Sequence, residues 1–192
     1  MEKPILFSTP MIRAILDGRK SQTRRIVKPQ PESVDHVNHK IIPYNGSAEF
    51  LMKNTICPYG KIGDVLWVRE TFHLVPPNMV FYKADPENKA TGKWKPSIFM
   101  PKEACRIRLE ITNISVERVQ DISKDDAIAE GIELYEGESN YKNYLHGDGR
   151  NYGYVKEAKI SYMTLWESIN GKDSWDINPW VWVIEFKRIQ PC

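Results

Sequence analysis

The sequence holds few cysteines and histidines. Its three cysteines, Cys57, Cys105 and Cys192, form no Cys-x-x-Cys pair, a pattern typical of free thiols in a reducing compartment. Of the four histidines only His36 and His39 lie close together, and no cysteine or carboxylate pattern completes a metal site with them. We therefore expect neither a disulfide framework nor a bound metal or other cofactor.

Long apolar runs, repeats and low-complexity tracts are also missing. No apolar stretch approaches the roughly 18 residues of a membrane-spanning helix. The N-terminal segment lacks the apolar core and small-residue cleavage site of a secretory leader. We expect a cytoplasmic protein without a membrane partner. Its 192 residues suit one domain over 1–192, and the sequence leaves the oligomeric state open.

Charge is concentrated at one end of the chain. The net charge is only +2, but the first 30 residues hold seven Lys or Arg and two acidic residues, so they carry +5 and the remainder carries −3. A local site for phosphate fits this distribution, whereas a basic face across the whole molecule does not.

Residues 18–25, Gly-Arg-Lys-Ser-Gln-Thr-Arg-Arg, are the most informative stretch. They follow a short helix predicted over residues 10–17, with Thr9 as its cap, and they open a strand predicted over 23–28. An amine, a hydroxyl and guanidinium groups therefore gather in one turn, which suits an anionic or carbonyl-bearing ligand. The alternative is a solvated run of charged side chains.

The remaining pattern predicts an α+β fold. Strands are expected over 65–69, 105–111 and 180–186, the last apolar on both faces and therefore central in its sheet. Short helices are expected from Ser123 to Gly131 and over 162–169. Because helices are few and do not alternate with strands, we predict a small, mostly antiparallel barrel with flanking helices. Long loop insertions are expected at about 30–60, 73–101 and 133–157.

The spacing of Gly18, Lys20, Thr23 and Arg25 fits Gly-x-Lys-x-x-Thr-x-Arg. This pattern resembles the signature of ASCH domains, which share a fold with the PUA RNA-binding domains. Three further segments resemble parts of that family, namely 61–70, 126–131 and 175–186. The matched pieces span about residues 5–188, and the insertions make the chain most similar to the larger ASCH proteins of bacteriophages and prophages.

The resemblance implies a protein that binds a nucleobase, in a modified nucleoside or in RNA. One small bacterial ASCH enzyme is an amidohydrolase that converts N4-acetylcytidine to cytidine and acetate. The resemblance places its catalytic lysine, threonine and glutamate on Lys20, Thr23 and Glu130. The alternatives are a non-catalytic RNA- or nucleotide-binding module of phage origin and a phage assembly or host-interaction protein. The insertions depart from the compact enzyme and leave the substrate open.

Two schemes of amide hydrolysis suit these residues. In one, Lys20 acts as the base for a Thr23 nucleophile, which requires its pKa to fall by several units from ~10.4. In the other, Glu130 activates water and a charged Lys20 stabilises the oxyanion. Each residue also has a structural alternative: a surface lysine, a threonine bonded to the backbone at a strand start, and a glutamate at a helix end.

Further residues are predicted to hold the ligand by charge or by stacking. The basic ones would bind a phosphate or orient the site, and loop aromatics would stack on a base. These residues are Arg19, Arg24, Arg25, Tyr59 and Trp94. By contrast, Trp180 and Trp182 alternate within an apolar strand, which favours a place in the core.

Overall fold

The structure of the protein is a computed structural model. It describes residues 1–30, 33–35, 40–42, 57–77, 79–87, 90, 92–134, 140–145 and 153–189. His36, His39 and Cys192 lie outside the described residues, as does most of the insertion predicted at 30–60.

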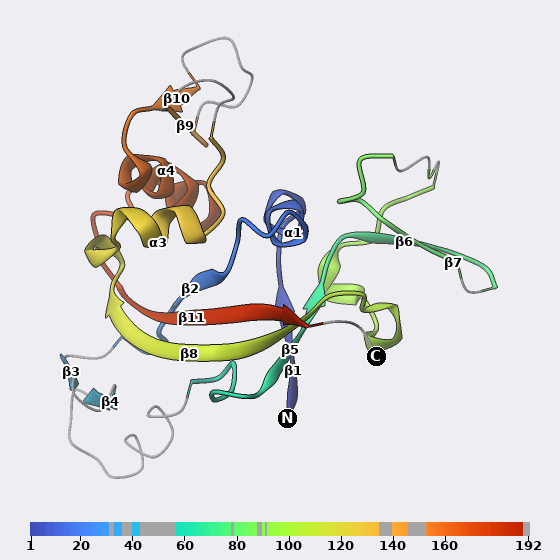
Figure 1. The fold of residues 1–192 in the computed structure, drawn as a ribbon, viewed down its shortest axis with the longest axis horizontal. Helices are drawn as coiled ribbons and strands as arrows, with labels where there is room; N and C mark the ends of the chain where they lie inside the picture. The colour runs from blue at the N-terminus through green and yellow to red at the C-terminus, as the bar shows by residue number, and fades with distance from the viewer. Residues whose placement is uncertain are drawn as a thin grey trace.

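A five-stranded sheet forms the centre of the fold (Figure 1). Its spatial order is β1-β5-β8-β11-β2, built from Glu2–Leu6, Val65–Arg69, Arg108–Arg118, Trp180–Ile189 and Gln22–Ile26. β1 and β5 are parallel, and every other neighbouring pair is antiparallel. The fold is therefore a mixed α+β fold with a mostly antiparallel sheet, as predicted.

In the described ranges, the main-chain ladders join five strands into an open order, and closure into the predicted barrel stays a prediction. Among the described residues, β1 and β2 lie at the two edges and share no ladder. A side chain connects them instead, because Nη2 of Arg25 on β2 donates to the carbonyl of Leu6 on β1 at 2.7 Å. The gap between the two edge strands is thus held by a guanidinium group rather than by backbone hydrogen bonds.

In the described part of the chain, three helices pack on the sheet. They are α1, Thr9–Leu16; α3, Lys124–Ala129; and α4, Ala158–Asn170. α3 begins at Ser123, whose hydroxyl accepts from the N–H of Asp126, so the predicted cap is confirmed. The cap of α1 is Ser8 rather than the predicted Thr9, and its side chain makes no capping bond. Figure 1 shows α3 and α4 side by side and α1 standing apart from them.

The strand β11 separates two apolar clusters. Trp180, Trp182 and Ile184 pack into the cluster that includes α1, whereas Val181 and Val183 pack into the cluster that includes α3 and α4. Since alternate residues of a strand point to opposite faces, α1 covers one face of the sheet and the α3–α4 pair covers the other. The prediction of a central strand, with both tryptophans in the core, is confirmed.

The boundaries of three strands differ from the prediction. β11 continues to Ile189 rather than ending at residue 186. β2 ends at Ile26 rather than at residue 28, because the amide of Gln30 bonds to the carbonyls of Val27 and Trp180 and takes the place of the next rung. β8 begins at Arg108 rather than at residue 105, just after a single 3-10 turn over Lys102–Ala104.

Short hairpins occupy the described parts of the insertions. The pairs are β3, Ser33–Asp35, with β4, Lys40–Ile42; β6, Phe72–Val75, with β7, Met79–Tyr82; and β9, Tyr141–Lys142, with β10, Tyr154–Val155. Two other 3-10 turns span Ser97–Phe99 and Val119–Asp121. β7 confirms the short strand expected inside the 73–101 insertion. No helix in the described ranges is long and apolar enough to cross a membrane.

Candidate ligand-binding site

The turn between α1 and β2 brings Lys20 against the end of α3. Gly18 ends α1 with a φ of 75°, in the left-handed region that glycine adopts most easily. The chain then folds back, and the N–H groups of Arg19 and Lys20 both donate to the carbonyl of Ala14. A single bridge pairs Lys20 with Glu130, so residues 110 positions apart become neighbours.

Lys20 and Glu130 form a buried ion pair. The Nζ of Lys20 lies 2.8 Å from Oε2 of Glu130 and also donates to the main-chain carbonyl of the same residue at 2.7 Å. The two side chains are 0% and 3% exposed. Lys20 lies over the ring of Phe7 as well, 5.7 Å from its centroid. A surface role for Lys20, one of the alternatives from the sequence, is therefore excluded.

Arg24 holds the other oxygen of Glu130. Its Nη1 lies 3.2 Å from Oε1 of Glu130, and its Nε donates to Glu117 at 2.7 Å. Its Nη2 lies 3.6 Å from Asp126, and the whole side chain is buried. The guanidinium also lies 5.9 Å from the ring centre of Tyr162. Glu130 is thus fixed between two cations, one on each carboxylate oxygen.

Burial and charge act against each other in this group. Burial lowers the pKa of Lys20, and the nearby carboxylate of Glu130 opposes that effect. Burial would also lower the pKa of Arg24, but Glu130 and Glu117 outweigh it and raise the pKa of the guanidinium. Arg24 therefore stays a cation, whereas the charge on Lys20 depends on the carboxylate that it contacts.

A cavity of about 620 Å³ opens beside this ion group. Glu130, Thr23 and Arg24 line it, but Lys20 does not. The rest of β2 and the segment after it contribute Arg25, Ile26, Val27 and Lys28. The other walls come from the end of β1, α1, the turn before β5, α4 and β11: Leu6, Ser8, Met11, Pro58, Tyr59, Tyr162, Leu165, Trp166, Ile169, Asn170 and Trp182.

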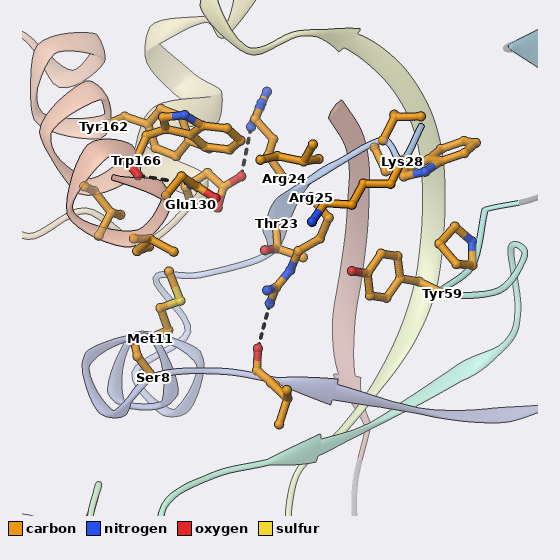
Figure 2. A pocket seen from close by; sticks show the side chains of 18 residues that line it. Ser8, Met11, Thr23, Arg24, Arg25, Lys28, Tyr59, Glu130, Tyr162 and Trp166 are labelled. Carbon is orange, nitrogen blue, oxygen red and sulfur yellow. Dashed lines mark hydrogen bonds and ion pairs between the residues drawn. The ribbon is translucent and has the colours of Figure 1, made fainter. Parts of the chain in front are cut away.

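The cavity has chemically different sides. Figure 2 shows Glu130 together with Tyr162 and Trp166 on one side, and Lys28 and Tyr59 on the other. Arg25 lies between them, below Thr23, and points toward the carbonyl of Leu6, to which it is bonded. An acidic and aromatic wall thus faces a basic rim.

Two polar groups in this cavity can form further hydrogen bonds. Within the described chain, the Nε of Arg25 is buried and has no hydrogen-bond partner. The hydrogen bonds of Lys20 run to Glu130 rather than to Thr23, so the threonine hydroxyl is not held by the lysine. The Thr23 hydroxyl, the Arg25 guanidinium and the Glu130 carboxylate can therefore form hydrogen bonds with a ligand in the cavity.

The structure brings together most, not all, of the residues predicted for the site. Thr23, Glu130, Arg24, Arg25 and Tyr59 line one cavity, with Lys20 directly behind Glu130. Two predicted ligand contacts lie elsewhere, and each has its own explanation.

Arg19 and Trp94 are the two residues that do not join the cavity. Arg19 follows the αL turn, and its guanidinium donates to Asp17 and to the carbonyl of Gly131. Trp94 belongs to the segment that pairs with β6, and its ring lies 6.3 Å from that of His73. Neither side chain is among those that line the cavity.

Other residues of the site were not predicted from the sequence. Glu117 and Asp126 complete the surroundings of Arg24, and Tyr162 and Trp166 form a wall of the cavity. The helical spacing of the two aromatic residues predicted a buried face correctly, but that spacing is the same whether the face meets a core or a ligand.

Comparisons with known proteins add little to this description. No protein-family model and no curated protein sequence matches the chain. Among solved structures, it is similar to the crystal structure of an ASCH domain from Lactobacillus crispatus JV V101, with 13% identity and a TM-score of 0.40, covering 99% of this chain and 80% of that one. The family resemblance rests on the sequence motifs.

Proposed function

We propose that this chain is an ASCH-domain protein of the larger, phage-type kind, and that its cavity binds a nucleobase in a nucleoside or in RNA. The observation that carries the proposal is Glu130, a carboxylate fixed by two cations at the wall of a cavity with aromatic sides and a basic rim. A volume of about 620 Å³ lies within the range of small-ligand pockets.

The walls suit the parts of a nucleotide. Tyr162 and Trp166 offer aromatic surface to a planar ring. Glu130 can accept from an exocyclic amine or a ring N–H, because an ionised carboxylate is an acceptor only. Arg25 and the exposed Lys28 at the rim suit a phosphate group.

We propose, further, that the same site hydrolyses an N4-acyl group from cytidine. The position of Lys20, behind Glu130 and off the cavity wall, favours Glu130 as the group that activates water. Because Lys20 does not line the cavity, we assign the oxyanion role to Thr23 instead of the lysine. Water adds to the acyl carbonyl and gives its proton to Glu130, the oxyanion accepts from the Thr23 hydroxyl, and the proton passes to the departing cytosine nitrogen. The products are cytidine and a carboxylic acid.

A second cavity provides room for an acyl group. It measures about 240 Å³ and shares five lining residues with the larger one: Ser8, Met11, Glu130, Leu165 and Ile169. Pro10 and the shared residues Met11, Leu165 and Ile169 make its lining largely apolar. An amide bond placed at Glu130 would have the base on one side and the acyl chain on the other.

Turnover of N4-acetylcytidine tests this proposal. We expect wild-type protein to convert it to cytidine, measured as the change in ultraviolet absorbance, and Thr23→Val to lower kcat/KM by on the order of 10²-fold because it removes one oxyanion donor. The matched control is Thr112→Val, since Thr112 is exposed on β8 and does not line the cavity; it should react like the wild type.

The result also separates the competing functions. Binding of N4-acetylcytidine without turnover at high enzyme concentration would leave the non-catalytic nucleotide-binding module and remove the hydrolase. Failure of N4-acetylcytidine, cytidine 5′-monophosphate and single-stranded RNA to bind at all would reject the proposed function.

A further inference from the structure

The cavity runs along the edge of a strand rather than across one face of the sheet. Six consecutive residues, 23–28, line it. Side chains of a strand alternate between its two faces, so a cavity on one face would contact every second residue only. Contact with an unbroken run means that the cavity follows the outer edge of β2, which is an edge strand of the sheet.

The hydrogen-bond register shows which main-chain groups face that edge. The N–H of Val27 donates to Trp180, and the N–H of Phe186 donates to the carbonyl of Ser21. In an antiparallel ladder the bonded pairs alternate with non-bonded ones, so the odd-numbered residues of β2 bond to β11. The N–H and C=O groups of Arg24 and Ile26 therefore point away from β11, toward the cavity.

No protein group within the described ranges pairs with these four main-chain atoms. The segment after α3 covers only the beginning of the edge, where the N–H of Ser21 donates to the carbonyl of Ala129. A single bridge joins Lys20 and Glu130, and the pairing stops there. The open edge thus starts beside the Glu130 carboxylate and continues past Arg24 to Ile26.

Buried main-chain groups are almost always hydrogen-bonded in folded proteins. Arg24 is 5% exposed, and Ile26 is half-buried. Two donors and two acceptors at the wall of a cavity, in fixed alternation, are therefore a recognition surface that a ligand can complete.

We infer that the main-chain N–H and C=O groups of Arg24 and Ile26 form hydrogen bonds with the ligand's heterocycle. They bond to the side of the heterocycle that would otherwise pair with another base. The inference rests on the proposed function and narrows its ligand class. A base whose pairing edge is bonded to β2 cannot be paired with another base. The site therefore takes free nucleosides, nucleotides and single-stranded RNA and rejects duplex RNA.

Amide hydrogen exchange measured by NMR tests the inference, with cytidine 5′-monophosphate as the probe. In the free protein the N–H groups of Arg24 and Ile26 should exchange fast, and saturation with the nucleotide should slow them at least tenfold. The N–H groups of Thr23 and Arg25 serve as the internal control, because they already bond to β11 and should change little.

A variant gives a second, independent measurement. Ile26→Pro removes one N–H that the fold does not use, and proline is tolerated on edge strands. We expect its melting temperature to fall by only a few degrees, because the half-buried Ile26 side chain packs at the margin of the α3–α4 cluster. Its affinity for the nucleotide should fall about fivefold, as for the loss of one hydrogen bond.

The possible outcomes separate failure of main-chain recognition from failure of the proposed function. Binding without slower exchange at Arg24 and Ile26, or equal affinity for single-stranded and duplex RNA, would overturn the inference and leave the proposed function standing. Absence of any binding would reject the proposed function and, with it, main-chain readout.

Discussion

Replacing Glu130 with glutamine is expected to lower the free energy of unfolding by about 3–5 kcal/mol, because it leaves the buried ammonium of Lys20 without its anion. Lys20 is fully buried and has Glu130 as its ion-pair partner, whereas Arg24 keeps Glu117. The variant should also lose turnover of N4-acetylcytidine. Urea denaturation followed by circular dichroism measures the first effect.

Glu133→Gln is the matched control for this change. Glu133 lies three positions further along and pairs with Lys142 at 2.8 Å, but both side chains are more than a third exposed. Exposed pairs contribute about 0–1 kcal/mol, so this variant should unfold almost like the wild type.

A double variant sharpens the test. Lys20→Met combined with Glu130→Gln removes both charges, so it should be less destabilised than the sum of the two single variants. Additive effects, or a Glu130→Gln variant no less stable than Glu133→Gln, would contradict the buried pair.

Replacing Gly131 with alanine is expected to have the second largest effect. Gly131 follows Glu130 with a φ of 86°, and a Cβ there would lie 2.8 Å from the Cβ of Ala14 and 2.9 Å from that of Lys20. Both neighbours are held by the backbone, so the turn that carries Glu130 must move. Overpacking of this kind costs about 1–3 kcal/mol, in addition to the cost of the left-handed conformation itself.

Gly63→Ala isolates the conformational part of that cost. Gly63 has the same φ of 86°, but a Cβ there would have no atom within 4 Å. We expect Gly63→Ala to lower the free energy of unfolding by about 1–2 kcal/mol and to leave nucleotide affinity unchanged. Gly131→Ala should lose more stability, and it should lose binding. Equal stability losses in urea denaturation would mean that the close approach to Lys20 is not a constraint.

Much of the fold could be predicted from local sequence signals. The cap at Ser123, the stop at Gly131 and the doubly apolar strand β11 depend on residues close to one another in sequence, and all three are confirmed. The contact between the two edge strands of the sheet was harder to predict. It depends on the Arg25 side chain reaching Leu6, a contact that no local pattern encodes.

The site could be predicted only in part, for the same reason. A run of charged residues in a sequence usually indicates a solvent-exposed segment. Lys20 and Arg24 are buried nonetheless, because carboxylates from β8, from α3 and from the residue after α3 form ion pairs with them. Glu130 was placed by family resemblance, and the structure brings it to Lys20. Trp94 was predicted to contact the ligand because it is an aromatic residue in a loop. In the structure it packs near His73 instead, and nothing in the neighbouring sequence indicates this.

The central claim is that the cavity between β2 and α4 holds a nucleobase at Glu130. A crystal structure of the protein with cytidine 5′-monophosphate tests it most directly. We expect the base between the edge of β2 and Trp166, with its exocyclic amine about 3 Å from the carboxylate of Glu130 and its phosphate toward Lys28. A nucleotide bound elsewhere, or an empty cavity at saturating concentration, would contradict it.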